Sequence, residues 1–123
     1  MKKILLIEDD PLLIDIYSTK LKQSGFEVSV VEQGEKALLA IESERPDLVL
    51  LDIVLPHTDG WDILSQVQAS EELRTIPVVV LSNLGQKEEI EKGLNLGAVK
   101  YLIKAHYTPS EIVEEVIKLV QTI

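Results

Sequence analysis

Four of the short apolar runs in this sequence are followed or closed by polar side chains that could do chemistry. These side chains are Glu8 with Asp9, Asp52, Ser82 and Lys104. Carboxylates are the ligands that Mg²⁺ prefers in proteins, and a carboxylate can also attack a phosphoryl group. An ammonium and a hydroxyl can hold the oxygens of that group during transfer. If the fold brings them together, these residue types indicate phosphoryl transfer to an aspartate.

Five runs rich in Ile, Val and Leu predict the strands that would position these groups. The runs are Ile4–Ile7, Val28–Val31, Leu48–Leu51, Val78–Leu81 and Tyr101–Ile103. They are continuously apolar rather than alternating, which is typical of strands buried on both faces of a parallel sheet.

Segments with apolar residues at helical spacing separate the runs. Gly25, Pro46 and Gly97 mark ends of these helices, and the last helix starts at the capping box Thr108–Glu111, with proline at its first position. The repeated alternation predicts an α/β fold: a doubly wound, flavodoxin-like parallel sheet of five strands in the order 2-1-3-4-5, with five helices. A glycine inside the fourth predicted helix, Gly93, should make that helix the least stable of the five.

In such a sheet, ligands bind beyond the carboxyl ends of the strands. We therefore expect Glu8, Asp9, Asp52, Ser82 and Lys104 to meet at that edge. Two carboxylates about 5 Å apart repel each other by roughly 3 kcal/mol at an effective dielectric constant near 20. A Mg²⁺ ion would offset this repulsion, with Asp52 as the central, attacking carboxylate.

The composition limits the function classes. With 123 residues, 46% of them apolar, the sequence predicts one domain, residues 1–123, without an effector domain. The absence of cysteine excludes disulfides and thiolate metal sites. A net charge of −9 disfavours direct binding to nucleic acid or to anionic membranes. No apolar stretch is long enough to cross a bilayer, so we expect a cytoplasmic protein.

Four motifs, taken together, resemble the response regulator receiver family of two-component signalling along the whole chain. They are the acidic pair Glu8-Asp9 after Ile4–Ile7, the segment Leu48–Pro56 followed by Asp59-Gly60, the strand Val78–Ser82, and Gly97-Ala98 with Tyr101–Lys104. The fold of this family is that of the chemotaxis regulators. Each motif alone is weak, but all four occur at the expected elements.

The resemblance implies a role for each of these residues. Asp52 would accept a phosphoryl group from a histidine kinase or phosphotransfer protein. Mg²⁺ would be bound by Glu8, Asp9, Asp52 and the backbone carbonyl of Val54. Lys104 and Ser82 would complete the catalytic set.

The resemblance further implies a conformational switch rather than a classical enzyme. Tyr101 would be a rotamer switch coupled to Ser82, although an aromatic residue in a buried strand is more often a core residue. The face formed by helix 4, strand 5 and helix 5 would change its affinity for a downstream protein target or effector domain. It would also allow a phosphorylation-dependent homodimer.

One position departs from the family pattern. Ala105 follows Lys104, where the family usually has a proline, often after a cis peptide bond. A cis bond before a residue other than proline costs about 2.5–4 kcal/mol, so a trans bond and a different approach of Lys104 are expected here.

Several residues have ordinary structural interpretations. Asp10 directly precedes Pro11 and is expected to be only the N-cap of the first helix. We expect Trp61 to pack in a loop or helix, and His57 and His106 to be exposed to solvent rather than to bind a metal or donate phosphate.

Three other functions remain as alternatives. An aspartyl phosphatase would need a second aspartate at position 54, which is Val54 here. A flavin- or nucleotide-binding module would need a phosphate loop in place of Glu8–Asp10. A non-phosphorylated pseudo-receiver that acts as an interaction scaffold is the main alternative, although the intact residue set argues against it.

Overall fold

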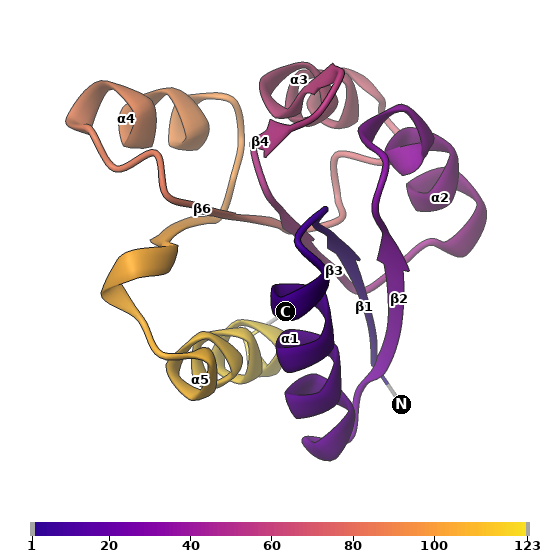
Figure 1. Ribbon diagram of the computed structural model, residues 1–123. Coiled ribbons are helices and arrows are strands. Elements are labelled where there is room, and N and C mark those ends of the chain that lie inside the picture. The colour runs from indigo at the N-terminus through magenta and orange to yellow at the C-terminus, as the bar shows by residue number, and fades with distance from the viewer. Residues whose placement is uncertain (1, 123) are drawn as a thin grey trace.

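A five-stranded parallel sheet forms the centre of the computed structural model, which describes residues 2–122 (Figure 1). Its strands are β1 (Lys3–Ile7), β2 (Glu27–Val31), β3 (Leu48–Leu51), β6 (Val78–Ser82) and β7 (Lys100–Ile103). Their order, β2-β1-β3-β6-β7, confirms the predicted order 2-1-3-4-5. The five apolar runs of the sequence therefore mark all five strands of this sheet.

Helices cover both faces of the sheet. They are α1 (Pro11–Gln23), α2 (Ala37–Glu44), α3 (Gly60–Ala69), α4 (Lys87–Asn95) and α5 (Pro109–Gln121), with short 3₁₀ turns η1 (Gly34–Lys36) and η2 (Lys104–His106). Helices α1 and α5 lie together on one face, and α2, α3 and α4 lie on the other side (Figure 1). None of the helices described in the chain could span a membrane.

Alternate residues of each central strand enter two separate hydrophobic cores. In β1, Leu5 and Ile7 pack with α2 and α3, whereas Ile4 and Leu6 pack with α1 and α5. All four side chains are at most 1% exposed. Because both faces of the strand are buried, the sequence shows a continuous apolar run instead of an alternating one.

The helix boundaries follow local capping. Asp10 Oδ1 accepts hydrogen bonds from the backbone of Leu12 at 2.9 Å and Leu13 at 3.4 Å, which confirms its prediction as an N-cap. At α5, Thr108 and Glu111 each accept a hydrogen bond from the other's backbone N–H, as the capping box predicted.

A short hairpin between β3 and α3 was not predicted. It consists of β4 (Val54–Leu55) and β5 (Thr58–Asp59), joined through a turn in which His57 has a φ of 60°. Two-residue strands are too short to produce a recognisable pattern in the sequence. The hairpin begins two residues after Asp52, and its first residue, Val54, lines the cavity that also contains Asp52.

Candidate functional site

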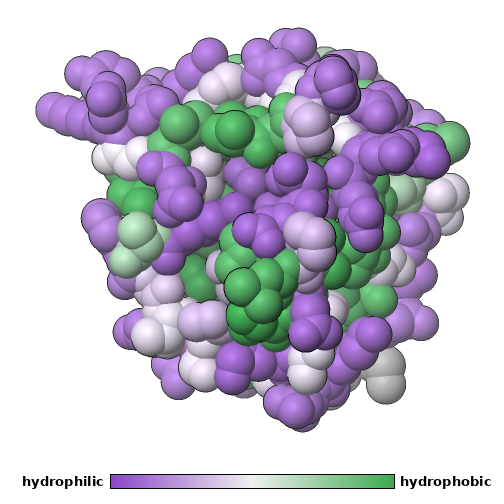
Figure 2. Space-filling model, viewed as in Figure 1, coloured by the Kyte–Doolittle hydropathy of each residue, from purple (hydrophilic) through white to green (hydrophobic). Residues whose placement is uncertain are grey.

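The strand register brings the predicted residues to one edge of the sheet. Ile7 pairs with Leu51, and the N–H of Asp52 donates to the carbonyl of Ile7 at 3.0 Å. On the other side of β3, Ser82 at the end of β6 lies opposite Ile103, the residue before Lys104. The edge therefore collects Glu8 and Asp9, Asp52, Ser82 and Lys104, as the sequence predicted. Hydrophilic residues form a band between hydrophobic areas on the face seen in Figure 2.

Three carboxylates are crowded at this edge. One oxygen from each of Glu8, Asp9 and Asp52 lies within 4.8 Å of the other two. Glu8 is 1% exposed and Asp52 is 6% exposed, while Asp9 is open to solvent. Burial raises the pKa of the Glu8 carboxyl, and the neighbouring Asp52 charge raises it further, although Lys104 opposes the shift.

Lys104 reaches two of the three acids. Its Nζ lies 2.6 Å from Glu8 Oε1 and 2.9 Å from Asp52 Oδ2, and its side chain is only 11% exposed. Burial alone would lower the pKa of Lys104, but the contacts with Glu8 and Asp52 outweigh it and raise that pKa. Lys104 is therefore held as an ammonium group between the two carboxylates.

The acidic cluster has the features of a site for a divalent cation. Glu8 Oε2 accepts hydrogen bonds from the backbone of Asp9 at 3.1 Å and Asp10 at 3.2 Å. Glu8 Oε1 is buried and accepts no hydrogen bond within the described chain, so Lys104 is its charged neighbour. Three carboxylates and one ammonium leave a formal charge of −2 (1 − 3). A buried carboxylate oxygen in a cluster with net negative charge fits a hard cation such as Mg²⁺.

Asp52 is fixed through both of its oxygens. Its Oδ1 accepts a hydrogen bond from the N–H of Val54 at 3.1 Å, and its Oδ2 accepts one from Lys104 at 2.9 Å. Val54 is 58% exposed and lines the same cavity as Asp52. The proposed role of the Val54 carbonyl as a metal ligand stays a prediction.

Ser82 is fully buried at the carboxyl end of β6. Its hydroxyl accepts a hydrogen bond from the N–H of Leu84 at 3.2 Å, a bond that does not use the hydroxyl proton. Both residues line the cavity over Asp52. The Ser82 hydroxyl thereby links that cavity to the loop before α4.

Tyr101 contacts the same loop from β7. Its hydroxyl donates to the carbonyl of Leu84, and burial raises its pKa. A Cβ at Gly93 in α4 would come within 2.8 Å of the Tyr101 ring, so the ring occupies the space that this glycine leaves. The structure thus connects Tyr101 to the Ser82 loop, as a switch would require, while the switching itself remains a prediction.

One residue of the site was not predicted to act. Asn83 lines the cavity, and its Oδ1 accepts a hydrogen bond from the N–H of Ala105 at 3.1 Å. The Lys104–Ala105 peptide bond is trans, like every other peptide bond in residues 2–122. The signal in the sequence was the departure from proline at position 105, which provides the N–H donor.

The ordinary interpretations agree with the structure. His57 and His106 are exposed. Trp61 packs against the core in the first turn of α3, and the Lys92 Nζ lies 4.8 Å from the centroid of its ring.

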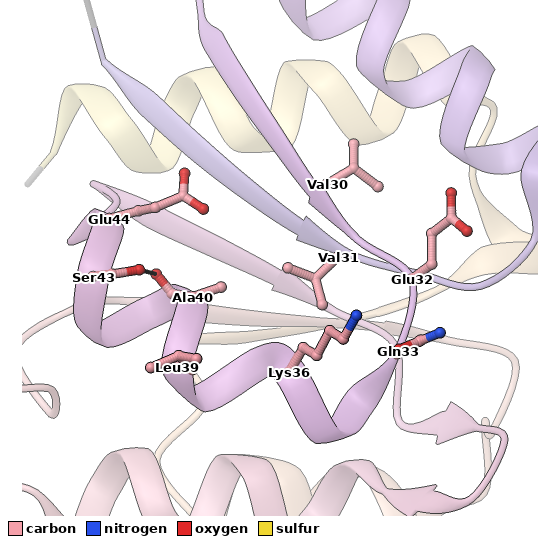
Figure 3. Close-up of a pocket in the computed structure, with 9 residues that line it drawn as sticks. All are labelled: Val30, Val31, Glu32, Gln33, Lys36, Leu39, Ala40, Ser43 and Glu44. Carbon is pink, nitrogen blue, oxygen red and sulfur yellow. Dashed lines mark hydrogen bonds between the residues drawn. The ribbon is translucent and has the colours of Figure 1, made fainter.

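The cavity over Asp52 is not the largest hollow of the molecule. It has a volume of about 360 Å³, whereas a groove between β2 and α2 has about 580 Å³. Figure 3 shows the charged groups of that groove apart from one another, with Glu32 and Glu44 at its opposite ends. Converging charged groups, rather than volume, identify the cavity over Asp52 as the candidate site.

Comparison with known proteins agrees with the resemblance seen in the sequence. The model of the response regulator receiver domain matches residues 4–117. The DNA-binding dual master transcriptional regulator RpaA of Synechocystis is 36% identical over 104 residues, which are 85% of this chain. The match covers 43% of that relative, so this chain corresponds to less than half of its length.

Solved receiver structures share the fold. The receiver domain of the Francisella response regulator 1452 is 27% identical, with a TM-score of 0.90, and the match covers 99% of this chain and 98% of that one. The Mn²⁺-bound form of response regulator Rcp1 is 28% identical, with a TM-score of 0.80, over 99% of this chain and 91% of that one. These similarities extend over nearly the whole chain.

Proposed function

Because the chain belongs to the response regulator receiver domain family of two-component systems, we propose that Asp52 accepts a phosphoryl group in a Mg²⁺-dependent reaction. The donor would be a phosphohistidine of a histidine kinase or phosphotransfer protein. The observation that carries the proposal is the contact of the Lys104 ammonium with both Asp52 and Glu8, at 2.9 and 2.6 Å, beside a third carboxylate. This arrangement supports the proposal because a carboxylate that could attack phosphorus, an ammonium and two further carboxylates lie around one small cavity.

The transfer would be a simple displacement at phosphorus. An oxygen of the Asp52 carboxylate forms a bond to phosphorus while the phosphorus–nitrogen bond of the phosphohistidine breaks. The electron pair of that bond leaves with the imidazole, which then takes up a proton. The product is an acyl phosphate on Asp52, and the domain is therefore a signalling module that is itself the substrate.

Glu8, Asp9, Asp52 and the Val54 carbonyl would hold Mg²⁺. When bound, the ion supplies positive charge that neutralises the phosphoryl oxygens and the acidic cluster. The buried Glu8 Oε1 supports this assignment, because the Lys104 ammonium beside it is shared with Asp52 and leaves the cluster with net negative charge. The Mn²⁺-bound form of Rcp1, a protein of the same fold, also supports a divalent cation in this chain.

Lys104 and Ser82 would hold the transferred group. The ammonium of Lys104 already contacts Asp52 Oδ2, so a phosphoryl group attached to Asp52 would lie within its reach. The Ser82 hydroxyl can donate its proton to another phosphoryl oxygen, because its hydrogen bond with Leu84 uses it as the acceptor.

The same contacts would convert phosphorylation into a conformational switch. A movement of Ser82 towards the phosphoryl group would pull on Leu84, whose carbonyl accepts the Tyr101 hydroxyl hydrogen bond. Tyr101 would then change its position against α4. The face formed by α4, β7 and α5 would in this way change its affinity for a downstream target, or form a homodimer.

We place the domain in the cytoplasm, between a histidine kinase or phosphotransfer protein and a downstream protein. RpaA, the relative described above, is a DNA-binding regulator that is more than twice as long as the matched segment. By analogy, the output would come from an effector domain or a separate target protein. The acidic receiver itself would not contact nucleic acid.

Labelling with acetyl phosphate tests the proposal. With Mg²⁺ present, intact-protein mass spectrometry should detect one phosphoryl group on the wild type and none on Asp52→Asn. Asp62→Asn makes the same chemical change at an exposed aspartate of α3 and should be labelled like the wild type. Omission of Mg²⁺ should slow the labelling.

Two results would contradict the proposal. Labelling that persists in Asp52→Asn would show that another residue is the acceptor. A wild-type protein that stays unlabelled would instead favour the non-phosphorylated scaffold.

A further inference from the structure

Asn83 and Ala105 join the two chain segments that carry Ser82 and Lys104. The N–H of Ala105 donates to Asn83 Oδ1 at 3.1 Å. The last paired residues of β6 and β7 are Ser82 and Ile103, so this hydrogen bond lies just beyond the end of the strand pair. It extends the connection between the two strands by one side-chain contact, at the border of the cavity over Asp52.

The bond requires the residue that departs from the family pattern. Proline has no backbone N–H, so a proline at position 105 could not donate to Asn83. The 3₁₀ turn that contains Lys104 is otherwise held by a long backbone hydrogen bond, from the N–H of Tyr107 to the Lys104 carbonyl at 3.4 Å. Asn83 therefore accepts a second hydrogen bond from this turn, and only a residue with a backbone N–H at position 105 can donate it.

We propose that Asn83 is a positioning residue for phosphoryl transfer, which holds the Lys104 turn against the end of β6 through the Ala105 N–H. This inference rests on the proposed function, because it assigns to Asn83 the placement of Lys104 for the reaction at Asp52. Asn83 itself need not touch the phosphoryl group. It acts through the backbone on either side of the Lys104–Ala105 peptide bond.

Lys104 needs such an anchor because its ammonium has two competing partners. Its Nζ contacts Glu8 and Asp52 together, and during transfer it would have to turn from Glu8 towards a phosphoryl oxygen. The long side chain can make this change only if its backbone keeps the distance to Asp52. If the turn were loose, Lys104 could keep its contact with Glu8 and move away from the phosphoryl group at Asp52.

The rate of labelling by acetyl phosphate, at saturating Mg²⁺, tests the role of Asn83. Asn83→Ala should lower the rate constant by about two- to tenfold, the range that one net hydrogen bond can supply. The affinity for Mg²⁺ should stay at the wild-type value, because Asn83 is not among the proposed ligands. Asn95→Ala, the same change at an exposed position at the end of α4, should leave the rate unchanged.

A double-mutant cycle with Ala105→Pro separates positioning from a general structural effect. Ala105→Pro removes the donor, so adding Asn83→Ala to it should change the rate by less than about twofold. Hydrogen exchange provides a readout that does not depend on phosphorylation. The Ala105 amide should exchange faster in Asn83→Ala than in the wild type, and at the wild-type rate in Asn83→Asp, which keeps the acceptor oxygen.

The outcomes distinguish this inference from the proposed function. If the wild type is labelled at Asp52 and Asn83→Ala is labelled equally fast, the positioning role alone is overturned. An equal loss of rate from Asn83→Ala in the wild-type and Ala105→Pro backgrounds would overturn it as well. A wild type that cannot be labelled would overturn the proposed function and the inference with it.

Discussion

The cavity over Asp52 and the groove between β2 and α2 differ in how close together their charged side chains lie. In the cavity over Asp52, Lys104 at the start of η2 contacts Glu8 and Asp52, which follow β1 and β3. Glu8, Asp52 and Ser82 are all buried there. In the larger groove between β2 and α2, Leu39 is 68% exposed and the charged groups lie apart (Figure 3).

This difference is the reason for taking the smaller hollow as the candidate site. Charges that are buried and close together alter each other's pKa and electrostatic energy, so a bound cation would relieve the repulsion among these carboxylates. Exposed and separated charges, such as Glu32 and Lys36 in the groove, are already solvated by water. Matched substitutions in the two hollows should therefore have unequal effects.

The largest difference is expected between two lysines. Lys104→Met should slow labelling of Asp52 by acetyl phosphate about a hundredfold, because it removes the cation that holds the phosphoryl oxygens. Lys36→Met, at an exposed position in the groove, should leave the labelling rate unchanged. Quenched time points with mass detection measure both, and circular dichroism checks that each variant is folded. A Lys104→Met protein labelled within threefold of the wild-type rate would remove this contrast.

Mg²⁺ should stabilise the protein by binding in the cavity over Asp52, and not by binding in the groove between β2 and α2. At a concentration 100 times its Kd, Mg²⁺ should add about 2.7 kcal/mol to the free energy of unfolding, which a thermal melt detects as a higher Tm. Asp9→Asn should abolish most of this gain, and it should slightly raise the metal-free Tm by relieving repulsion. Glu32→Gln in the groove should retain the full Mg²⁺ effect. An equal response in all three proteins would argue for unspecific ion binding.

A glycine near Tyr101 should behave differently from an exposed helical residue beside the groove. Alanine normally stabilises a helix by about 1 kcal/mol relative to glycine. At Gly93, however, the new Cβ would come within 2.8 Å of the Tyr101 ring, so Gly93→Ala should instead lower the free energy of unfolding by about 1 kcal/mol. Ser43→Ala in α2 should be neutral or slightly stabilising. Urea unfolding measures both. A Gly93→Ala variant more stable than the wild type would contradict the prediction and show that the Tyr101 ring can move aside at little cost.

The smallest of these effects on stability is expected from surface ion pairs. We compare the pair Lys100–Glu115, beside β7, with the pair Lys3–Glu44, near β2. Lys100 Nζ lies 2.6 Å from Glu115 Oε2, and this contact lowers the pKa of Glu115 below 4.5. The stabilisation is therefore complete above pH 4.5 and is lost as the pH falls through the lowered pKa. Since Lys100 is 39% exposed, Glu115→Gln should cost only about 0.5 kcal/mol at pH 7.

Urea unfolding at several pH values tests this prediction. The difference between Glu115→Gln and the wild type should shrink as the pH is lowered below 4.5. Glu44→Gln changes a longer contact, 3.9 Å from Lys3 Nζ, and should have a smaller effect at pH 7. A Glu115 effect that does not depend on pH would point to packing rather than charge.

Local sequence patterns determined the fold and the membership of the site. Buried parallel strands appear in the sequence as continuous apolar runs. The carboxyl ends of these strands lie at the same edge of the sheet, so Asp52, Ser82 and Lys104 could be expected to meet there. Caps such as Asp10 were equally predictable, because they depend on residues only two or three positions apart.

Tertiary structure alone decided how the gathered groups contact one another. That Lys104 pairs with Glu8 as well as Asp52 depends on distances between three loops, and no local pattern encodes them. The same is true of the Asn83–Ala105 hydrogen bond, whose partners are 22 residues apart, and of the Tyr101 ring against Gly93. Side-chain contacts between distant segments require the packed backbone, whereas strands and caps require only their own neighbourhood.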